Sequence, residues 1–193
     1  MSLLGLPDEI LVQILSYSVL RRRDLCRISL VSQRLFFLAT PNIYYEVDFY
    51  TWKFPKPVRL ENFLRTLDQS PERADLVRIL NLPWRASINQ GPPYVFSILR
   101  RLPMLHTLNI TNITAQPIAQ DSRFIFGGLG FPDNCPMAFL RKLTISDPGI
   151  TATDIIKYST LPSIEYLEVI WFSGKNDSDP SCLTISTGNA LAI

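Results

Sequence analysis

A single histidine limits the acid–base chemistry that this chain could perform. His106 is the only histidine among 193 residues, and most hydrolases with a serine or cysteine nucleophile need a histidine beside it as general base. No Gly-x-Ser-x-Gly turn accompanies it. His106 lies next to a predicted strand, where an ordinary exposed or hydrogen-bonded histidine is the commoner case. We therefore expect a non-catalytic protein; the alternative, an enzyme that depends on His106, would lose its activity in His106→Ala.

The cysteines and glycines do not indicate a metal or cofactor site. Cys26, Cys135 and Cys182 are odd in number, far apart and without a Cys-x-x-Cys motif, which predicts neither a disulfide framework nor a zinc site. The glycines at 127, 128 and 130 lack the lysine and the strand-to-helix context of a phosphate-binding loop. We expect no cofactor and no metal, and a reduced chain in the cytoplasm, the nucleus or both.

Charge and hydropathy argue against nucleic acid and membranes as partners. Nineteen Lys and Arg against 17 Asp and Glu leave a net charge of +2, which provides no long-range field for polyanions. The arginines at 21–23 are typical of a solvated corner between helices. No stretch approaches the roughly 18 apolar residues of a membrane span, and Pro7 with its following acids interrupts any signal-peptide stretch. We expect no nucleic acid binding, no membrane binding and no secretion.

Three short helices are predicted at the N-terminal end. The first runs from about Pro7 to Tyr17, because proline is tolerated at the first helical position and two acids follow it. Asp24 is a plausible cap for a second helix, and Ser32 for a third over residues 33–39 that ends near Pro41. A unit of this size buries little of its own surface, so it is marginal without a partner or a neighbouring domain.

The order of apolar residues in these helices resembles the F-box. Taken singly, Pro7, Ile10, Leu11 and Ile14 could be only the core side of an amphipathic helix. Many F-boxes have tryptophan where this chain has Leu35, which keeps an apolar contact of smaller area. Residues 39–45 are similar to the exit of the F-box in fungal members with repeats downstream. The segments that carry the resemblance are Leu6-Pro7-Asp8-Glu9-Ile10, Ile14-Leu15, Asp24-Leu25, Leu30-Val31-Ser32 and Leu38-Ala39.

The resemblance implies that the first helix and the start of the third dock on a Skp-family adaptor, which in turn binds a cullin. Each buried aliphatic side chain would contribute about 1.5 to 3 kcal/mol, offset by the costs of association. No reactive group is needed. The residues implied in adaptor binding are Leu6, Pro7, Ile10, Leu11, Ile14, Leu25, Leu30, Val31, Ser32 and Leu35.

Four segments of the remaining chain share one apolar pattern. In each, apolar residues follow one another at offsets of three and two, at irregular intervals along the chain. This pattern is similar to the leucine-rich repeat, in which parallel strands present alternate side chains inward and a helix or loop returns outside. The four segments are Val77, Leu80 and Leu82; Leu105, Leu108 and Ile110; Leu140, Leu143 and Ile145; and Ile164, Leu167 and Val169.

The connections between these segments also fit such an array. Helical apolar spacing at Leu60–Leu67, Tyr94–Leu102 and Thr153–Ser159 predicts returning helices. Ala115–Pro136 is rich in glycine and proline, which predicts a long loop. Because Cys182–Ile193 shows no polar closing helix, we expect the array to be incomplete at its C-terminal end, with its last strand an exposed edge.

Residues between the inward positions are predicted to face a bound target. Side chains alternate along a strand, so these residues point away from the core, where each could equally be an ordinary solvated position. Ile79 belongs to the same set by position. The candidate target-binding residues are Asn81, Thr107, Asn109, Lys142, Thr144, Tyr166 and Glu168.

The sequence as a whole predicts a protein that bridges two others. Its expected fold is α plus α/β: a three-helix F-box at residues 1–47, then an irregular leucine-rich-repeat-like solenoid at 48–193. The expected function is that of a substrate receptor in a Skp–cullin–F-box ubiquitin ligase, which recruits an unknown protein target. The alternative is a repeat protein whose first helices cap the solenoid and never enter a ligase.

Overall fold

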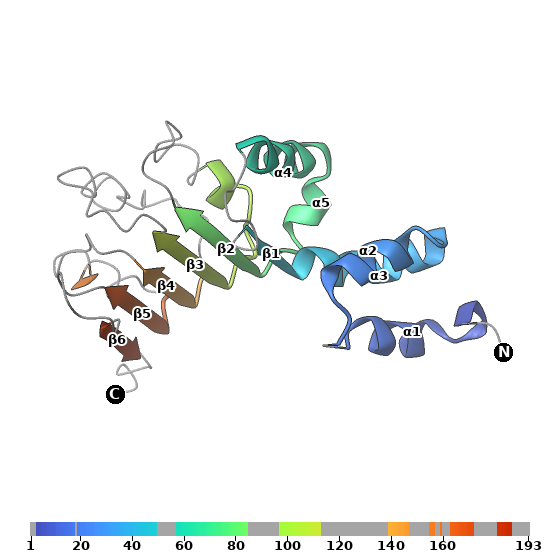
Figure 1. Cartoon of the computed structure of the whole chain (residues 1–193), viewed down its shortest axis with the longest axis horizontal. Helices are drawn as coiled ribbons and strands as arrows, with labels where there is room; N and C mark the ends of the chain where they lie inside the picture. The colour runs from blue at the N-terminus through green and yellow to red at the C-terminus, as the bar shows by residue number, and fades with distance from the viewer. Residues whose placement is uncertain are drawn as a thin grey trace. The chain divides into compact units, whose positions relative to one another are not determined.

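The chain divides into two compact units. The computed structural model (Figure 1) describes residues 3–17, 19–49, 57–84, 97–112, 139–146, 155–156, 159, 163–171 and 181–186. The first unit comprises Met1–Glu46 and the second Val47–Ile193; they are called the helical unit and the sheet unit below. The boundary predicted after residue 47 lies one residue beyond this division. No helix among the described residues is long and apolar enough to cross a membrane.

The helical unit contains three α-helices, as predicted. They follow a short 3-10 turn and are α1, α2 and α3 in Figure 1. Their bounds are η1 Leu3–Gly5, α1 Asp8–Leu15, α2 Arg22–Ser29 and α3 Gln33–Tyr45.

The start of α2 differs from the prediction, whereas the start of α3 agrees with it. Arg22 opens α2, so the second and third arginines of the triplet lie in its first turn rather than in a loop. Asp24 is not the cap; its carboxylate accepts the backbone N–H of Arg21 at 3.2 Å, which suits an acid in the first helical turn. Ser32 caps α3 as predicted, its hydroxyl oxygen accepting the N–H of Leu35 at 3.2 Å.

The predicted end of α3 near Pro41 is wrong. Proline removes a helical hydrogen bond and normally kinks or ends a helix, yet α3 continues through it to the end of the unit. Ala39 and Ile43, which flank the proline, are both buried in one apolar cluster with Leu15 and Leu25. Burial on both sides of Pro41 offsets the lost hydrogen bond, and this packing could not be read from the local sequence.

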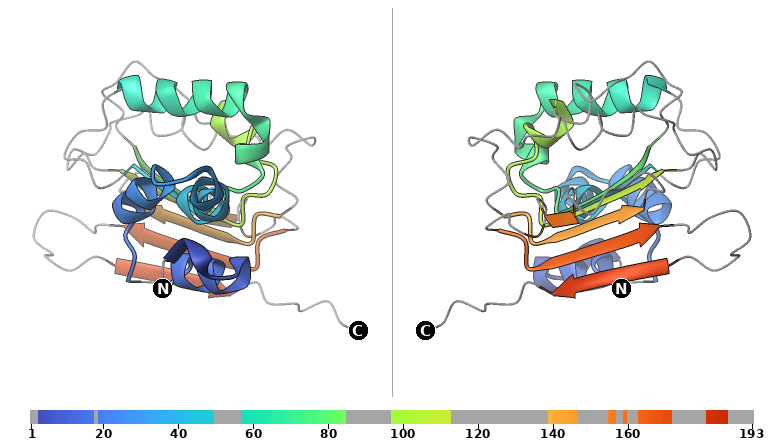
Figure 2. Two further views of the ribbon diagram at one scale, coloured as in Figure 1. Left: turned by 90° about the vertical axis from the view of Figure 1, so that its right-hand side faces the viewer. Right: turned by 90° about the vertical axis from the view of Figure 1, so that its left-hand side faces the viewer.

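The sheet unit is built on a six-stranded sheet in simple chain order, seen along two further directions in Figure 2. Strands β2 to β5 are parallel, and β6 is antiparallel to β5. The bounds are β1 Glu46–Asp48, β2 Ile79–Trp84, β3 Thr107–Asn112, β4 Lys142–Ser146, β5 Tyr166–Trp171 and β6 Ser181–Ser186.

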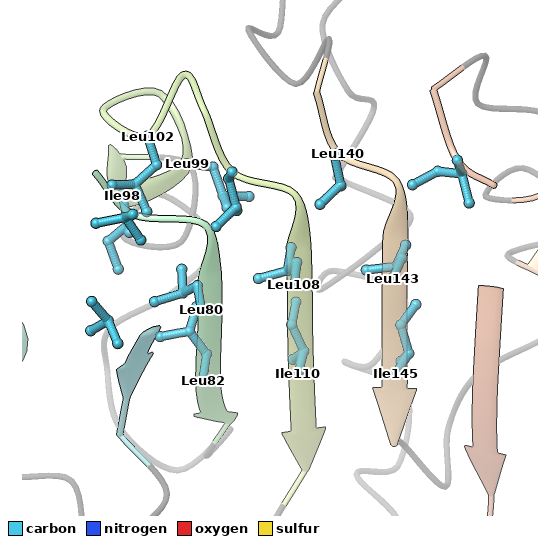
Figure 3. Close-up of a cluster of buried hydrophobic side chains, with 14 of the residues drawn as sticks. Leu80, Leu82, Ile98, Leu99, Leu102, Leu108, Ile110, Leu140, Leu143 and Ile145 are labelled. Carbon is cyan, nitrogen blue, oxygen red and sulfur yellow. The ribbon is translucent and has the colours of Figure 1, made fainter. Parts of the chain in front are cut away.

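The four parallel strands pair in the register that the apolar pattern predicts. Leu80 lies beside Leu108, which lies beside Leu143, which lies beside Leu167. All twelve residues of the sequence pattern are buried, with exposures of 6% or less. Figure 3 shows the leucines and isoleucines of neighbouring strands side by side on one face. The prediction of adjacent parallel strands with a shared inward face is therefore confirmed.

Helical segments supply the rest of this core. The helices α4, Pro57–Gln69, and α5, Pro71–Ala74, connect β1 to β2, and Leu67 and Ala74 pack in the same cluster as the strand leucines. The helix predicted at Leu60–Leu67 is thus confirmed.

Two other predicted returns fall partly on described residues. Within Tyr94–Leu102, residues 97–99 form a helical turn, and Ile98, Leu99 and Leu102 are buried beside the strands (Figure 3). Within Thr153–Ser159, residues 155, 156 and 159 are helical. The loop predicted at Ala115–Pro136 lies outside the described residues.

The last strand was not predicted. The fourth apolar segment was expected to form an exposed edge, which is wrong: β6 pairs with β5 along its whole length, from Trp171 beside Ser181 to Tyr166 beside Ser186. Ile185 packs against the core beside Leu167. The apolar spacing of the four parallel strands does not recur here, because an antiparallel edge strand has neighbours on one side only. The sheet is consequently mixed.

Candidate protein-interaction site

Helix α1 has an aliphatic side that its own chain leaves open. Ile10 and Ile14, one helical turn apart, are 41% and 40% exposed, whereas Leu11 and Leu15 are buried. Residues four apart share a helix face, so the two isoleucines form one apolar strip beside the buried leucines. An isoleucine strip at this exposure is surface that a partner could cover.

The connection from α2 to α3 presents a second pair of aliphatic residues. Leu30 is 85% exposed and Val31 is 66% exposed. Their backbone is nevertheless fixed, because the N–H of Leu30 donates to the Arg27 carbonyl at 3.2 Å and that of Val31 to the Ile28 carbonyl at 3.0 Å. Both side chains are therefore held out at a fixed point immediately before the cap of α3. Ile10, Ile14, Leu30 and Val31 are called the exposed aliphatic residues below.

The other predicted adaptor-binding residues occupy different positions. Leu11, Leu25 and Leu35 are 1%, 5% and 2% exposed, so their side chains hold the helices together and offer little area to a partner. Pro7 is exposed at the N-cap of α1 and Leu6 is half-buried. The hydroxyl of Ser32 caps α3 by accepting the Leu35 N–H.

Arg34, at the start of α3, is a residue that the sequence reasoning missed. Its Nε donates to Asp8 Oδ1 at 2.7 Å, and its two terminal nitrogens donate to the carbonyls of Leu4 and Leu6, each at 2.7 Å. One guanidinium thus ties the N-terminal turn and the start of α1 to α3. No local pattern signals this contact, since an arginine in the first turn of a helix ordinarily projects into water.

In the sheet unit, the predicted target-facing residues form two rows across the strands. The inward leucines lie between them in sequence, so the rows lie on the opposite face of the sheet. The pairing register brings the members of each row to neighbouring strands, about 4.8 Å apart. The first row is Ile79, Thr107, Lys142 and Tyr166, and the second is Asn81, Asn109, Thr144 and Glu168.

Side chains within and between these rows contact one another. Asn109 Nδ2 donates to Asn81 Oδ1 at 2.6 Å, and Thr144 Oγ1 donates to Glu168 Oε2 at 3.3 Å. Lys142 Nζ lies 3.9 Å from Glu168 Oε2 and 4.7 Å from the centre of the Tyr166 ring. Asn81 is buried at 9% exposure, so it supports Asn109 instead of facing a target. The hydroxyl and charged groups of the other residues can hydrogen-bond a polypeptide.

His106 lies outside both rows, one residue before β3. Its ring is 6.4 Å from that of Phe139. Partial burial lowers the pKa of His106 from its ordinary value of 6.5, and the positive charges of Arg78 and Arg141 lower it further. Arg141 is itself paired with Glu165 at 2.9 Å. The described residues contain no group of three His, Cys, Asp or Glu side chains that could hold a metal ion.

Comparison with known proteins identifies the helical unit. Residues 3–50 match the F-box-like family model. This segment is an F-box-like domain. The F-box-like domain covers all three helices and every one of the exposed aliphatic residues. No curated protein matches the chain.

Proposed function

We propose that this protein is a substrate-receptor subunit of a Skp–cullin–F-box ubiquitin ligase. The observation that carries the proposal is the pairing of an F-box-like domain at residues 3–50 with aliphatic side chains left exposed on that domain. F-box proteins are generally non-catalytic adaptors. In this role the chain positions a target near the ubiquitin-loaded enzyme and performs no bond chemistry itself.

Burial of the exposed aliphatic residues would drive adaptor binding. Leu30 and Val31 are the most exposed of them, and full burial of such a side chain contributes about 1.5 to 3 kcal/mol. The costs of association offset much of the sum over the four side chains, so polar contacts around them must contribute to a stable complex as well. The buried leucines of the domain keep the four residues in place.

We propose that the sheet unit holds the target through the face that carries the two polar rows. Four parallel strands with leucines in register support a leucine-rich-repeat-like interpretation of this unit, while the antiparallel β6 departs from such a repeat. Asn109 is held by the buried Asn81, and Lys142 lies 3.9 Å from Glu168, so a target would meet side chains that their neighbours already position.

The adaptor-binding role is tested by co-purification with a Skp-family adaptor. The variant combines Pro7→Ala with Ile10→Asp, both at exposed positions, so that the fold is preserved while a charge enters the docking surface. The matched control is Val12→Asp, on the same helix at 42% exposure and about 200° around the axis from Ile10. We expect loss of the adaptor only with the first variant; equal recovery from all three proteins contradicts the proposal.

The target-binding role is tested by capture of proteins on the intact chain, read by mass spectrometry. We expect Asn109→Ala combined with Lys142→Ala to lose particular captured proteins while adaptor recovery stays at the wild-type level. Arg65→Ala, an exposed change on α4, is the control and should lose neither. Targets retained by the double variant would place target binding elsewhere on the chain.

A further inference from the structure

The N-terminal turn of the helical unit depends on a side chain that comes from α3. Residues Leu4 and Leu6 are separated from Arg34 by 30 and 28 positions, yet both carbonyl oxygens accept hydrogen bonds from its guanidinium at 2.7 Å. The third partner, the Asp8 carboxylate, lies in the first turn of α1. Arg34 therefore contacts the segment before α1 and α1 itself at one point.

These contacts use properties that only arginine has. The guanidinium is planar and carries five N–H donors in a fixed fork, so one side chain can reach three acceptors at once. Lysine has a single charged nitrogen and cannot span them with the same geometry. The ion pair with Asp8 by itself would be worth little, because both side chains are exposed to solvent. The hydrogen bonds to the Leu4 and Leu6 carbonyls add to this ion pair and connect the segment before α1 to α3.

Arg34 also links the two segments that carry the exposed aliphatic residues. Val31 lies in the α2–α3 connection, three positions before Arg34, and Ile10 lies in α1, two positions after Asp8. The bond from Arg34 to Asp8 consequently joins the helix that carries Ile10 and Ile14 to the helix that follows Leu30 and Val31. Leu11 and Leu15 are the buried side chains of α1, and Leu15 shares an apolar cluster with Ala39 and Ile43 of α3. Arg34 adds a polar contact at the N-terminal end of the same helix.

We propose that Arg34 is a positioning residue for adaptor docking: it holds Leu4–Asp8 and α1 so that Ile10 and Val31 reach the same partner together. The inference rests on the proposed adaptor-binding function. Without this clamp α1 stays helical, but its first turn and the segment before it must be positioned when the adaptor binds, which lowers affinity although every residue that touches the adaptor is still present.

The first experiment compares Arg34→Lys with Arg27→Lys in the full chain. Arg27 is an exposed arginine of the same unit whose nearest carboxylate, Asp24, is 4.0 Å away, so its replacement controls for the loss of a guanidinium. We expect Arg34→Lys to weaken binding of a purified Skp-family adaptor about tenfold, equal to about 1.4 kcal/mol, at unchanged stoichiometry and unchanged helix content by circular dichroism. Arg27→Lys should bind as the wild type does. Equal affinities for the two variants overturn the proposal.

A double-mutant cycle separates positioning from a general loss of structure. In the wild type, Ile10→Ala and Val31→Ala should each weaken adaptor binding. In the Arg34→Lys background, Ile10→Ala should have a much smaller further effect, because α1 is already misplaced, whereas Val31→Ala should keep its full effect. If both substitutions add fully to Arg34→Lys, Arg34 acts independently of α1 and the proposal is wrong.

Hydrogen exchange distinguishes failure of this inference from failure of the proposed function. We expect the amides of residues 4–11 to exchange faster in Arg34→Lys than in Arg27→Lys, with or without an adaptor. Unchanged exchange rates at residues 4–11 overturn the positioning role of Arg34, whether or not the adaptor binds. Faster exchange together with a wild-type chain that binds no adaptor overturns the ligase function and, with it, the docking role of Arg34.

Discussion

The two units treat their large apolar side chains in opposite ways. Among the described residues, the sheet unit buries most of its leucines, isoleucines and valines in one cluster that extends from β1 to β5, and partly buries most of the others. The helical unit buries a small cluster around Leu15, Leu25, Ala39 and Ile43 and leaves most of its other large apolar residues exposed.

This difference follows from how much apolar surface each unit can bury on folding. Apolar burial is the main favourable term in folding, and a short three-helix segment has too little interior to use all its apolar residues. A sheet covered on one face by helices has enough interior to bury its apolar residues. In the helical unit several exposed aliphatic residues lie together on one short domain and indicate a partner, whereas in the sheet unit Ile156 and Leu183 are single exposed positions beside a large core.

The largest effect should come from the core of the sheet unit. Leu143 is 1% exposed in the central strand β4, so Leu143→Ala should lower the free energy of unfolding by about 2 to 5 kcal/mol through lost burial and a residual cavity. Leu183 on the edge strand is 37% exposed, and Leu183→Ala should cost less than about 1 kcal/mol. Urea unfolding followed by circular dichroism measures both; equal losses would contradict a single continuous core.

In the helical unit, a leucine-to-alanine substitution at an exposed position should weaken adaptor binding and leave stability unchanged. Leu30 is 85% exposed, so Leu30→Ala should leave the urea midpoint unchanged and weaken adaptor binding about tenfold, given the 1.5 to 3 kcal/mol that burial of a leucine provides. Leu25, five positions earlier on α2, is buried, and Leu25→Ala should instead destabilise the chain. Calorimetric titration with the adaptor, beside urea unfolding, checks the pair. A loss of stability in Leu30→Ala would mean that Leu30 packs in the core, which contradicts its role in docking.

A smaller effect is expected at the helix cap. Ser32→Ala removes the acceptor of the Leu35 N–H and should cost about 1 kcal/mol of stability. Ser32→Asp restores an acceptor and should recover most of it, which circular dichroism during thermal unfolding can measure. Because Leu30 and Val31 lie directly before the cap, adaptor affinity should fall with Ser32→Ala and return with Ser32→Asp. Failure of the aspartate to restore either would mean that the cap is not what orders this turn.

The smallest effect concerns His106 in the sheet unit. Burial, with Arg78 and Arg141 nearby, lowers its pKa in the folded state below the ordinary 6.5. The unfolded chain thus holds the proton more tightly, so stability should fall as the pH drops from 6.5 to the lowered pKa and then level off. His106→Asn should remove this part of the pH dependence, measured as the urea midpoint between pH 7 and pH 5. An identical pH profile in the variant would assign the effect to other groups.

Much of the fold could be predicted because its signals are local or periodic. Ser32 before an apolar stretch is a capping signal that depends on one turn of backbone. The recurrence of leucine at offsets of three and two predicted both the strands and their register, since each strand must bury the same face against the same layer. Asp24 shows the limit of this reasoning, because a carboxylate serves a helix start equally well as a cap or three residues inside it.

For the candidate site, the sequence identified the segment but could not sort its residues. It placed Ile10, Leu11, Leu25 and Leu30 together in one docking set, although the structure buries two of them and exposes two. An aliphatic residue has the same chemistry in a core and at an interface. Only the packing of the helices decides which side chains are already covered.

The sequence by itself determined the order of the elements, the inward face of four strands and the F-box-like character of the first helices. Tertiary structure alone decided that α3 continues past Pro41, that β6 closes the sheet in the antiparallel sense, and that Arg34 reaches back to the start of α1. The physical reason is range. Capping and periodicity act between near neighbours in the chain, whereas these three features depend on contacts between segments that meet only when the chain is folded.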